Sequence, residues 1–229
     1  MTFTIVGRCA RTGHLGVCMA TSSPAVGNRC AFVSRDGAVG FQAIAEPRLG
    51  AATLRLIEAR NSPRAAIDLI GQADDWPEHR QIGIVDADGR AAAFTGSNNM
   101  EWAGHRIGPG YVAMGNLLAS AKVVEAIETA FRDSEDEILE ERLVRAIEAG
   151  RDAGGQEEGQ LSASILSFGP ETFARCDLRV DHSPEPVAEL RRIFDWYRPL
   201  IPYFLARTAD PNQLRHKDWL KRQGIIRDE

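Results

Sequence analysis

The first half of the chain is dominated by short runs in which hydrophobic and polar side chains alternate. In residues 2–8 this pattern predicts a strand with the threonines and Val6 on one face and Phe3 and Ile5 on the other. Residues 15–20 repeat the pattern after a glycine turn, so the two runs are predicted to pair as a hairpin. The predicted strands that follow are residues 30–34, 38–44, 81–85, 91–95, 111–114, 161–167 and 173–180.

Several of the segments between these strands have hydrophobic residues at helical spacing. Two helices are predicted after the fourth strand, with Ser62 as the N-cap of the second. A long helix is predicted after Asn116, and a capping box of Ser134 and Glu137 is predicted to open the next one. Residues 96–110 are polar and rich in glycine, which indicates an irregular loop where ligand contacts often concentrate.

The chain ends in a segment of different composition. From residue 184 it carries helical patterns and clustered aromatics between prolines, and Asp210 and Pro211 are predicted to open the last helix. We therefore expect residues 1–183 to form one layered α+β domain and residues 184–229 to form a C-terminal helical extension. The aromatic side chains favour packing of the extension on its own domain or on a neighbouring subunit, so a homo-oligomer is predicted.

The charge balance narrows the class of partner. The 229 residues include 27 Lys and Arg against 32 Asp and Glu, a net charge of -5, which disfavours binding to a nucleic-acid backbone. No secretory leader and no apolar run of membrane-spanning length are present in the sequence, so a cytoplasmic protein without a membrane partner is expected. A small-molecule substrate or ligand is the expected partner.

The motifs predict neither a metal nor a cofactor. The four cysteines show no C-x-x-C spacing and no histidines at zinc-ligand offsets, so they are interpreted as reduced, buried thiols. A reactive Cys18 or Cys30 is the alternative, because both would lie beside the first strand. The glycines at 104, 108 and 110 precede a strand and not a helix, so the context of a phosphate-binding loop is missing.

Several spaced motifs together resemble one known family. From residue 2 to about residue 200 the chain resembles the bacterial and archaeal domain of unknown function family 1028. That family is placed in the N-terminal nucleophile (Ntn) hydrolase superfamily, so the resemblance implies an α+β fold of the four-layer α-β-β-α sandwich type. The motifs are TFTIVGR at 2–8, GHLGV at 13–17, SSPAVG at 22–27, RQIGIVDADGR at 80–90, FTG at 94–96, GNLL at 115–118, DLRVD at 177–181 and PVAEL at 186–190.

Thr2 is the first candidate catalytic residue. If Met1 is removed, which a small second residue permits, Thr2 would carry a hydroxyl nucleophile and an α-amine that acts as its general base. Otherwise Thr2 is a residue of high β-propensity at the start of a strand. Proteasome-type members of the superfamily have an Asp after the second strand and then a lysine. Here that position holds Thr21, Ser22 and Ser23, and no lysine is nearby.

Amide and hydroxyl side chains supply the other candidates. Amidase-type members use an oxyanion asparagine, so the resemblance makes Asn116 a catalytic candidate, with a helix N-cap as its structural alternative. Ser22 is a candidate for orienting the amine, and Ser23 for holding substrate; the alternative for both is a turn at the end of a strand. Gln42 and His105 complete the substrate-binding candidates, His105 because it lies in the polar loop and titrates near neutral pH.

The function predicted from these residues is that of an Ntn-type amidohydrolase that cleaves a small amide or related C–N bond. Thr2 would attack the carbonyl, and an amide donor such as Asn116, Asn98 or Asn99 would stabilise the oxyanion. A non-catalytic binding or assembly protein that retains the sandwich is the alternative, favoured by the missing Asp and Lys. A third option is a hydrolase with an internal nucleophile such as Ser22 or Cys18.

Overall fold

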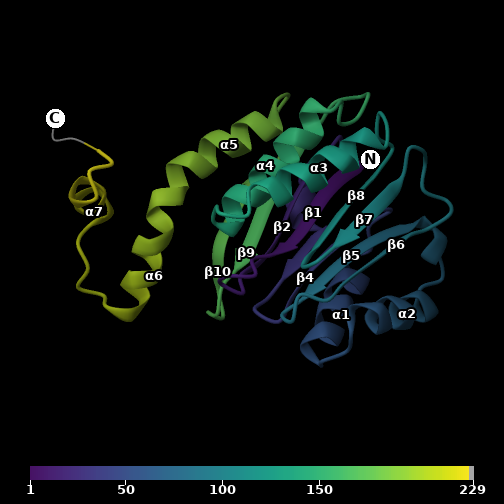
Figure 1. The fold of residues 1–229 in the computed structure, drawn as a ribbon, viewed down its shortest axis with the longest axis horizontal. Coiled ribbons are helices and arrows are strands. Elements are labelled where there is room, and N and C mark those ends of the chain that lie inside the picture. The colour runs from purple at the N-terminus through teal and green to yellow at the C-terminus, as the bar shows by residue number, and fades with distance from the viewer. Residues whose placement is uncertain (227–229) are drawn as a thin grey trace.

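Two antiparallel sheets form the centre of the molecule in the computed structural model, which describes residues 1–226 (Figure 1). The six-stranded sheet has the order β10 (Ala174–Val180), β9 (Ser162–Phe168), β2 (Leu15–Thr21), β1 (Thr2–Arg8), β8 (Tyr111–Asn116) and β7 (Gly104–Gly108). The four-stranded sheet has the order β3 (Ala31–Val33), β4 (Gly37–Ala43), β5 (Arg80–Asp86) and β6 (Ala91–Thr95). Strand β1 therefore lies inside the larger sheet, between β2 and β8.

The two sheets pack face to face over an apolar layer. Val6, Val17, Val85 and Met114 belong to the hydrophobic cluster between the sheets, and all four are fully buried. The sheets approach closely at Gly40, where an added Cβ would lie 2.7 Å from the Cε atom of Met114. A glycine at this position of β4 therefore sets the spacing of the two sheets.

Helices cover the outer face of each sheet (Figure 1). Helices α3 (Lys122–Asp133) and α4 (Leu139–Asp152) pack on the six-stranded sheet, where Phe3 and Ile5 of β1 contribute to their shared apolar cluster. Helices α1 (Pro47–Glu58) and α2 (Pro63–Ala73) pack on the four-stranded sheet. The molecule is thus a mixed α+β protein. Short 3-10 turns occupy Val26–Asn28, Pro77–His79 and Arg198–Leu200.

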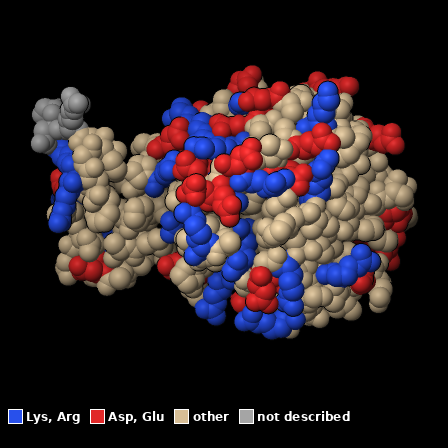
Figure 2. All heavy atoms as spheres, in the orientation of Figure 1, with Lys and Arg blue, Asp and Glu red and all other residues tan. Residues whose placement is uncertain are grey.

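The C-terminal segment begins on the body of the molecule and then leaves it. Helix α5 (Pro186–Tyr197) buries its apolar side in the cluster that it shares with α4. Ile201 and Leu205 of α6 (Ile201–Ala209) pack against the same cluster, whereas α7 (His216–Arg222) lies away from the sheets (Figure 1). Acidic and basic side chains intermingle on the face shown in Figure 2. Arg191 of α5 pairs with Glu141 at 2.8 Å and Glu148 at 2.7 Å, both on α4. These pairs fasten α5 to the domain.

The alternation predicted for the first strand is confirmed, since Phe3 and Ile5 face the helices while Val6 faces the second sheet. The buried, reduced state predicted for the cysteines is also confirmed. The capping box at Ser134 is wrong: its hydroxyl bonds back to the oxygen atoms of Ala130 and Phe131, so Ser134 ends α3 and α4 begins later, at Leu139. A serine at the last turn of a helix satisfies free carbonyls there.

Two further boundaries differ from the prediction. The polar stretch 96–110 is not wholly irregular, because β7 forms within it and pairs with β8. The last helix begins at His216 and not at Asp210, whose carboxylate instead accepts the main-chain N–H of Asn212 in a turn. Among residues 1–226, no helix is long and apolar enough to cross a bilayer.

Candidate functional site

The N-terminal end of β1 brings three polar side chains from three strands together. Thr2 lies opposite Thr21 of β2 on one side and opposite Asn116 of β8 on the other. The hydroxyl oxygens of Thr2 and Thr21 are 3.1 Å apart, and Thr21 donates to the main-chain oxygen of Met1. Thr2 is therefore the donor in the pair. All three side chains are buried, so each needs a partner within the protein.

Gln42 of β4 reaches across the gap between the sheets to hold this end of β1. Its side-chain amide donates to the main-chain oxygen of Thr2 at 3.2 Å and to the Oε1 atom of Gln81 at 2.8 Å. Its own Oε1 atom accepts from the hydroxyl of Thr4 at 2.5 Å. Because Gln42 is fully buried and both ends of its amide are engaged, its side chain fixes the position of Thr2.

Gln81 of β5 is the centre of the buried network. Its Oε1 atom accepts from Gln42 and, at 3.0 Å, from the amide of Asn116. Its amide nitrogen lies 2.8 Å from the main-chain oxygen of Gly115 and 2.9 Å from the hydroxyl of Thr95. One side chain thus links both sheets. The amide of Asn116 belongs to this network, and its predicted alternative as a helix N-cap is wrong, because the next helix begins at Lys122.

His105 of β7 joins the network from its outer end. Its Nδ1 atom is 2.8 Å from the hydroxyl of Thr95, which in turn contacts Gln81. Burial lowers the pKa of His105 below its ordinary value, so the neutral imidazole is favoured near neutral pH. The predicted candidates Thr2, Gln42, Asn116 and His105 therefore belong to one connected set of hydrogen bonds.

Two small cavities flank Met1 at the same end of β1. One has a volume of about 70 Å³ and the other about 160 Å³. Ala43 lines the first with a φ of 71°, and Leu117 lines the second with a φ of 50°. Non-glycine residues rarely adopt this left-handed conformation, and such residues cluster at functional sites. The other lining residues are Ile44, His79, Asn98, Asn99, Met100 and Asn116 in the first cavity, and Glu101, Leu118, Glu157 and Glu158 in the second.

The groups around this chain end have shifted protonation equilibria. Burial lowers the pKa of the Met1 α-amine, against the opposing effects of Cys30 and Glu158 nearby. Burial also raises the pKa of the Cys30 thiol to about 11, so Cys30 stays protonated at neutral pH. The carboxamide oxygen of Asn99 is buried at the smaller cavity without a hydrogen-bond partner among the described residues. The site thus combines a partly desolvated amine with amide groups.

Ser22, Ser23 and Cys18 lie apart from this network. The two serines follow the end of β2, and within residues 1–226 neither side chain forms a hydrogen bond; only the main-chain oxygen of Ser23 accepts, from Ser162 at 2.7 Å. Cys18 is completely buried on the helix side of the sheet, and burial raises the pKa of its thiol strongly. The alternative of Cys18 as an accessible nucleophile is therefore wrong.

Three members of the network were missed as candidates from the sequence: Thr21, Gln81 and Thr95. Thr21 and Thr95 are polar residues that end otherwise apolar strands, and Gln81 is a buried polar residue near the start of β5, which is the signal that could have marked them. Their meeting depends on strand pairing, since Gln81 is in register with Gln42 on one side and with Thr95 on the other. Within the part of the chain that the structure describes, no group of three or more His, Cys, Asp or Glu side chains could hold a metal ion.

Fold and site define the chain as an α+β protein with two packed antiparallel sheets and a buried amide and hydroxyl network at the start of its first strand. It belongs to a family of unknown function, DUF1028, whose family model matches residues 2–190. The crystal structure of protein SPO2555 from Silicibacter pomeroyi, described with the same family model, is similar to it with a TM-score of 0.79 and 30% identity. The match covers 86% of this chain and 88% of that one. A search among curated proteins gave no significant match.

Proposed function

We propose that the protein is an Ntn-type amidohydrolase that cleaves a small amide or related C–N bond, with the two sheets and their outer helices as an Ntn-type four-layer sandwich. The observation that supports it best is the position of Thr2: its hydroxyl lies in the buried network while the chain end beside it is flanked by two cavities. Removal of Met1 would free the α-amine of Thr2 and empty the space between these cavities. A small-molecule substrate would bind in that space.

The proposed reaction uses two groups of Thr2, its side-chain hydroxyl and its free α-amine. Its amine takes the hydroxyl proton as the oxygen attacks the substrate carbonyl, and the proton then passes to the leaving nitrogen as the C–N bond breaks. Water releases the acyl group from the resulting ester. A desolvated amine is a suitable base, because burial holds the pKa of an amine below its ordinary value, as it does for Met1.

Asn116 is the proposed oxyanion donor. It lines the smaller cavity. Its side-chain amide donates one N–H to Gln81, so the second N–H is available to an oxyanion. Gln42 is proposed to position Thr2 and not to touch substrate, since its amide is already engaged on both sides. His105, Ser22 and Ser23 line neither cavity, so their roles stay predictions with less support.

An intact-mass measurement and two variants test this function. We expect the mass of residues 2–229, release of amine or ammonia from at least one member of a panel of small amides, lactams and ureas, and loss of about 10³-fold in turnover in Thr2→Ala. Thr2→Ser should retain part of the turnover. The matched control is Thr172→Ala, the same change at an exposed position, which should leave turnover unaltered. Full turnover in Thr2→Ala excludes the nucleophile.

A non-catalytic binding protein is the second candidate function. It is favoured by the chemistry of the network: within residues 1–226, the side-chain partners that hydrogen-bond to Thr2 are hydroxyl and amide groups, and none is a carboxylate or a lysine. In that case Met1 stays in place and the amides bind a ligand by hydrogen bonds. A retained Met1 in the intact mass, together with no turnover on the panel, would support this candidate over the enzyme.

A further inference from the structure

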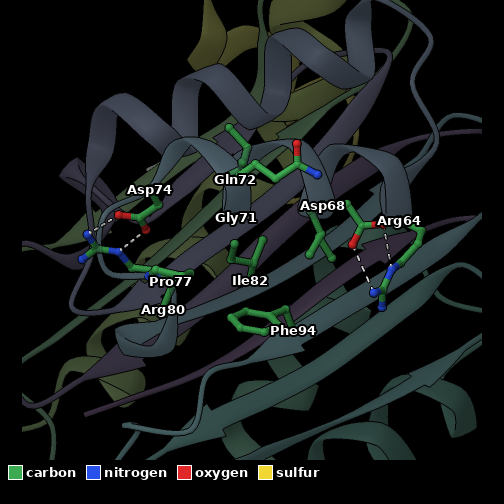
Figure 3. A pocket seen from close by; sticks show the side chains of 11 residues that line it. Arg64, Asp68, Gly71, Gln72, Asp74, Pro77, Arg80, Ile82 and Phe94 are labelled. Atoms are coloured by element: carbon green, nitrogen blue, oxygen red, sulfur yellow. Dashed lines mark hydrogen bonds and ion pairs between the residues drawn. The ribbon is translucent and has the colours of Figure 1, made fainter.

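A larger cavity lies on the opposite side of the four-stranded sheet from Thr2. It has a volume of about 450 Å³, is open to solvent on one side, and is bordered by helix α2 and by strands β5 and β6 (Figure 3). Sites for small molecules commonly have volumes of roughly 300 to 1,000 Å³. The network around Thr2 contributes no residue to this cavity, so the two places are separate, and a ligand could bind here whether or not Thr2 is catalytic.

The floor of this cavity is apolar. Ile67 and Ile70 come from α2, Ile82 comes from β5 and Phe94 from β6. Figure 3 shows Ile82 and Phe94 side by side below the helix. The three isoleucines are buried, so only a molecule that enters the cavity would gain contact with them. Covering apolar surface contributes about 25 cal/mol per Å², which favours a ligand with an apolar body.

Charged side chains at the two ends of the cavity are already paired with each other. At one end Arg80 binds both carboxylate oxygens of Asp74, at 2.7 and 3.0 Å, and at the other end Arg64 lies 3.1 Å from Asp68 (Figure 3). Each end therefore has one positive and one negative group. The Arg80–Asp74 pair is buried, so at that end a charged ligand would have to disturb it in order to bind, whereas an uncharged ligand would not. The Arg64–Asp68 pair is exposed and costs little to separate.

Gly71 leaves the middle of the cavity open. It lies in the last turn of α2, two residues before the helix ends at Ala73. A Cβ atom at this position would have no heavy atom within 4 Å, so packing does not require a glycine there. The absent side chain is what keeps the space empty. The exposed amide of Gln72 beside it has no hydrogen-bond partner within residues 1–226 and is available to a ligand.

We propose that this cavity binds an uncharged, mainly apolar small molecule, of the size of one or two rings, that carries a hydrogen-bonding group toward Gln72. The apolar floor supplies affinity, the buried Arg80–Asp74 pair disfavours ions, and the amide orients the polar group. Nothing in this arrangement resembles the hydroxyl and amide network of the first site. It is a second binding site, on the outer face of the smaller sheet.

Four matched probes test the site on the full chain: benzyl alcohol and indole, which are uncharged, and benzoate and benzylammonium, which are not. Amide chemical shifts recorded by two-dimensional NMR locate the binding. We expect saturable shifts in α2, β5 and β6 with dissociation constants in the millimolar range for the uncharged pair, consistent with the small number of atoms. The two ions should bind at least about tenfold more weakly.

Two variants of one residue separate filling of the cavity from a change in the helix. Gly71→Leu should fill the space and weaken benzyl alcohol and indole by about tenfold or more, whereas Gly71→Ala should bind them within about threefold of the wild type. Both remove the helix glycine, so circular dichroism should show both to be folded. Equal binding by Gly71→Leu, equal binding of the ions, or no saturable shift with either uncharged probe would overturn the proposal.

Discussion

The side-chain amide of Gln42 donates a hydrogen bond of 3.2 Å to the main-chain oxygen of Thr2 across the space between the two sheets. The first strand of the larger sheet is therefore held by a residue of the smaller one. Since Gln42 also binds Gln81, the position of Thr2 depends on a buried amide chain and not only on its neighbours within the sheet.

Gln81→Leu should strongly destabilise the protein. The change removes the acceptor for Gln42 and Asn116 and leaves the oxygen of Gly115 without its donor, so several buried polar groups lose partners. We expect a loss of about 2–4 kcal/mol in the free energy of unfolding, measured by urea denaturation. The matched control is Gln223→Leu at an exposed position, which should change stability by less than about 0.5 kcal/mol. Equal losses in both variants would contradict the role of Gln81.

His105 should make the folded state less stable as the pH falls. Burial lowers its pKa in the folded protein, so between about 6.5 and that lowered value the unfolded chain binds a proton that the folded chain does not. The free energy of unfolding should therefore decrease over this window, and His105→Asn should show a smaller decrease. Burial lowers the pKa of His14 as well, which adds an effect of the same sign. The comparison is therefore made in a His14→Asn background, by urea denaturation at pH 7.5 and 5.5. Identical pH dependence with and without His105 would refute this.

The four thiols should differ in reactivity toward iodoacetamide. Burial raises the pKa of Cys18, Cys30 and Cys176, so these should remain unmodified in the folded protein at pH 8 and react only in concentrated urea. Burial acts in the same direction on Cys9, but hydrogen bonds from Thr12 and the adjacent main chain outweigh it and lower its pKa. Cys9 should react first, and more slowly in Thr12→Val. Peptide mass spectrometry gives the order; earlier modification of Cys18 would disprove it.

A homo-oligomer remains the prediction for the C-terminal extension. Trp196 is 65% exposed and Phe204 is 42% exposed on this part of the surface, which is unusual for large aromatic residues. If they meet a second copy, Trp196→Glu should halve the molar mass of a dimer in light scattering. Trp76→Glu is the control, because Trp76 is 60% exposed and lies outside the C-terminal extension, between α2 and β5. A wild-type monomer, or dissociation in both variants, would rule this out.

The strands and their faces could be predicted from the sequence because alternation is a local property. The placing of Phe3 and Val6 on opposite faces follows from a period of two residues alone. Ser134 shows the limit of such reasoning. The three-residue spacing from Ser134 to Glu137 is typical of the start of a helix. In the structure, however, the Ser134 hydroxyl donates to a carbonyl in the last turn of the preceding helix. Whether a serine caps the start of one helix or ends the helix before it depends on the conformation of the neighbouring turns.

The network could be predicted only in part. Thr2, Gln42 and Asn116 were recognisable as candidates because each is a polar residue with an identifiable chemical use. Their contacts could not be derived, because Gln81 joins residues 39 and 35 positions away, and these meet only through the pairing of strands in two sheets. The larger cavity had no signal in the sequence beyond a glycine inside α2, which by itself indicates only a weaker helix.

Three successive residues of strand β5 contribute to both candidate sites, because they alternate between the two faces of the sheet. Arg80 and Ile82 face the cavity under α2, and Gln81 between them faces the opposite sheet. A shift of one residue in the pairing of β4 with β5 would exchange the faces and bring a guanidinium group among the buried amides. Both sites would be lost together. Both sites therefore require β5 to pair in the correct register during folding. Molecules in which this register is shifted would lack both sites.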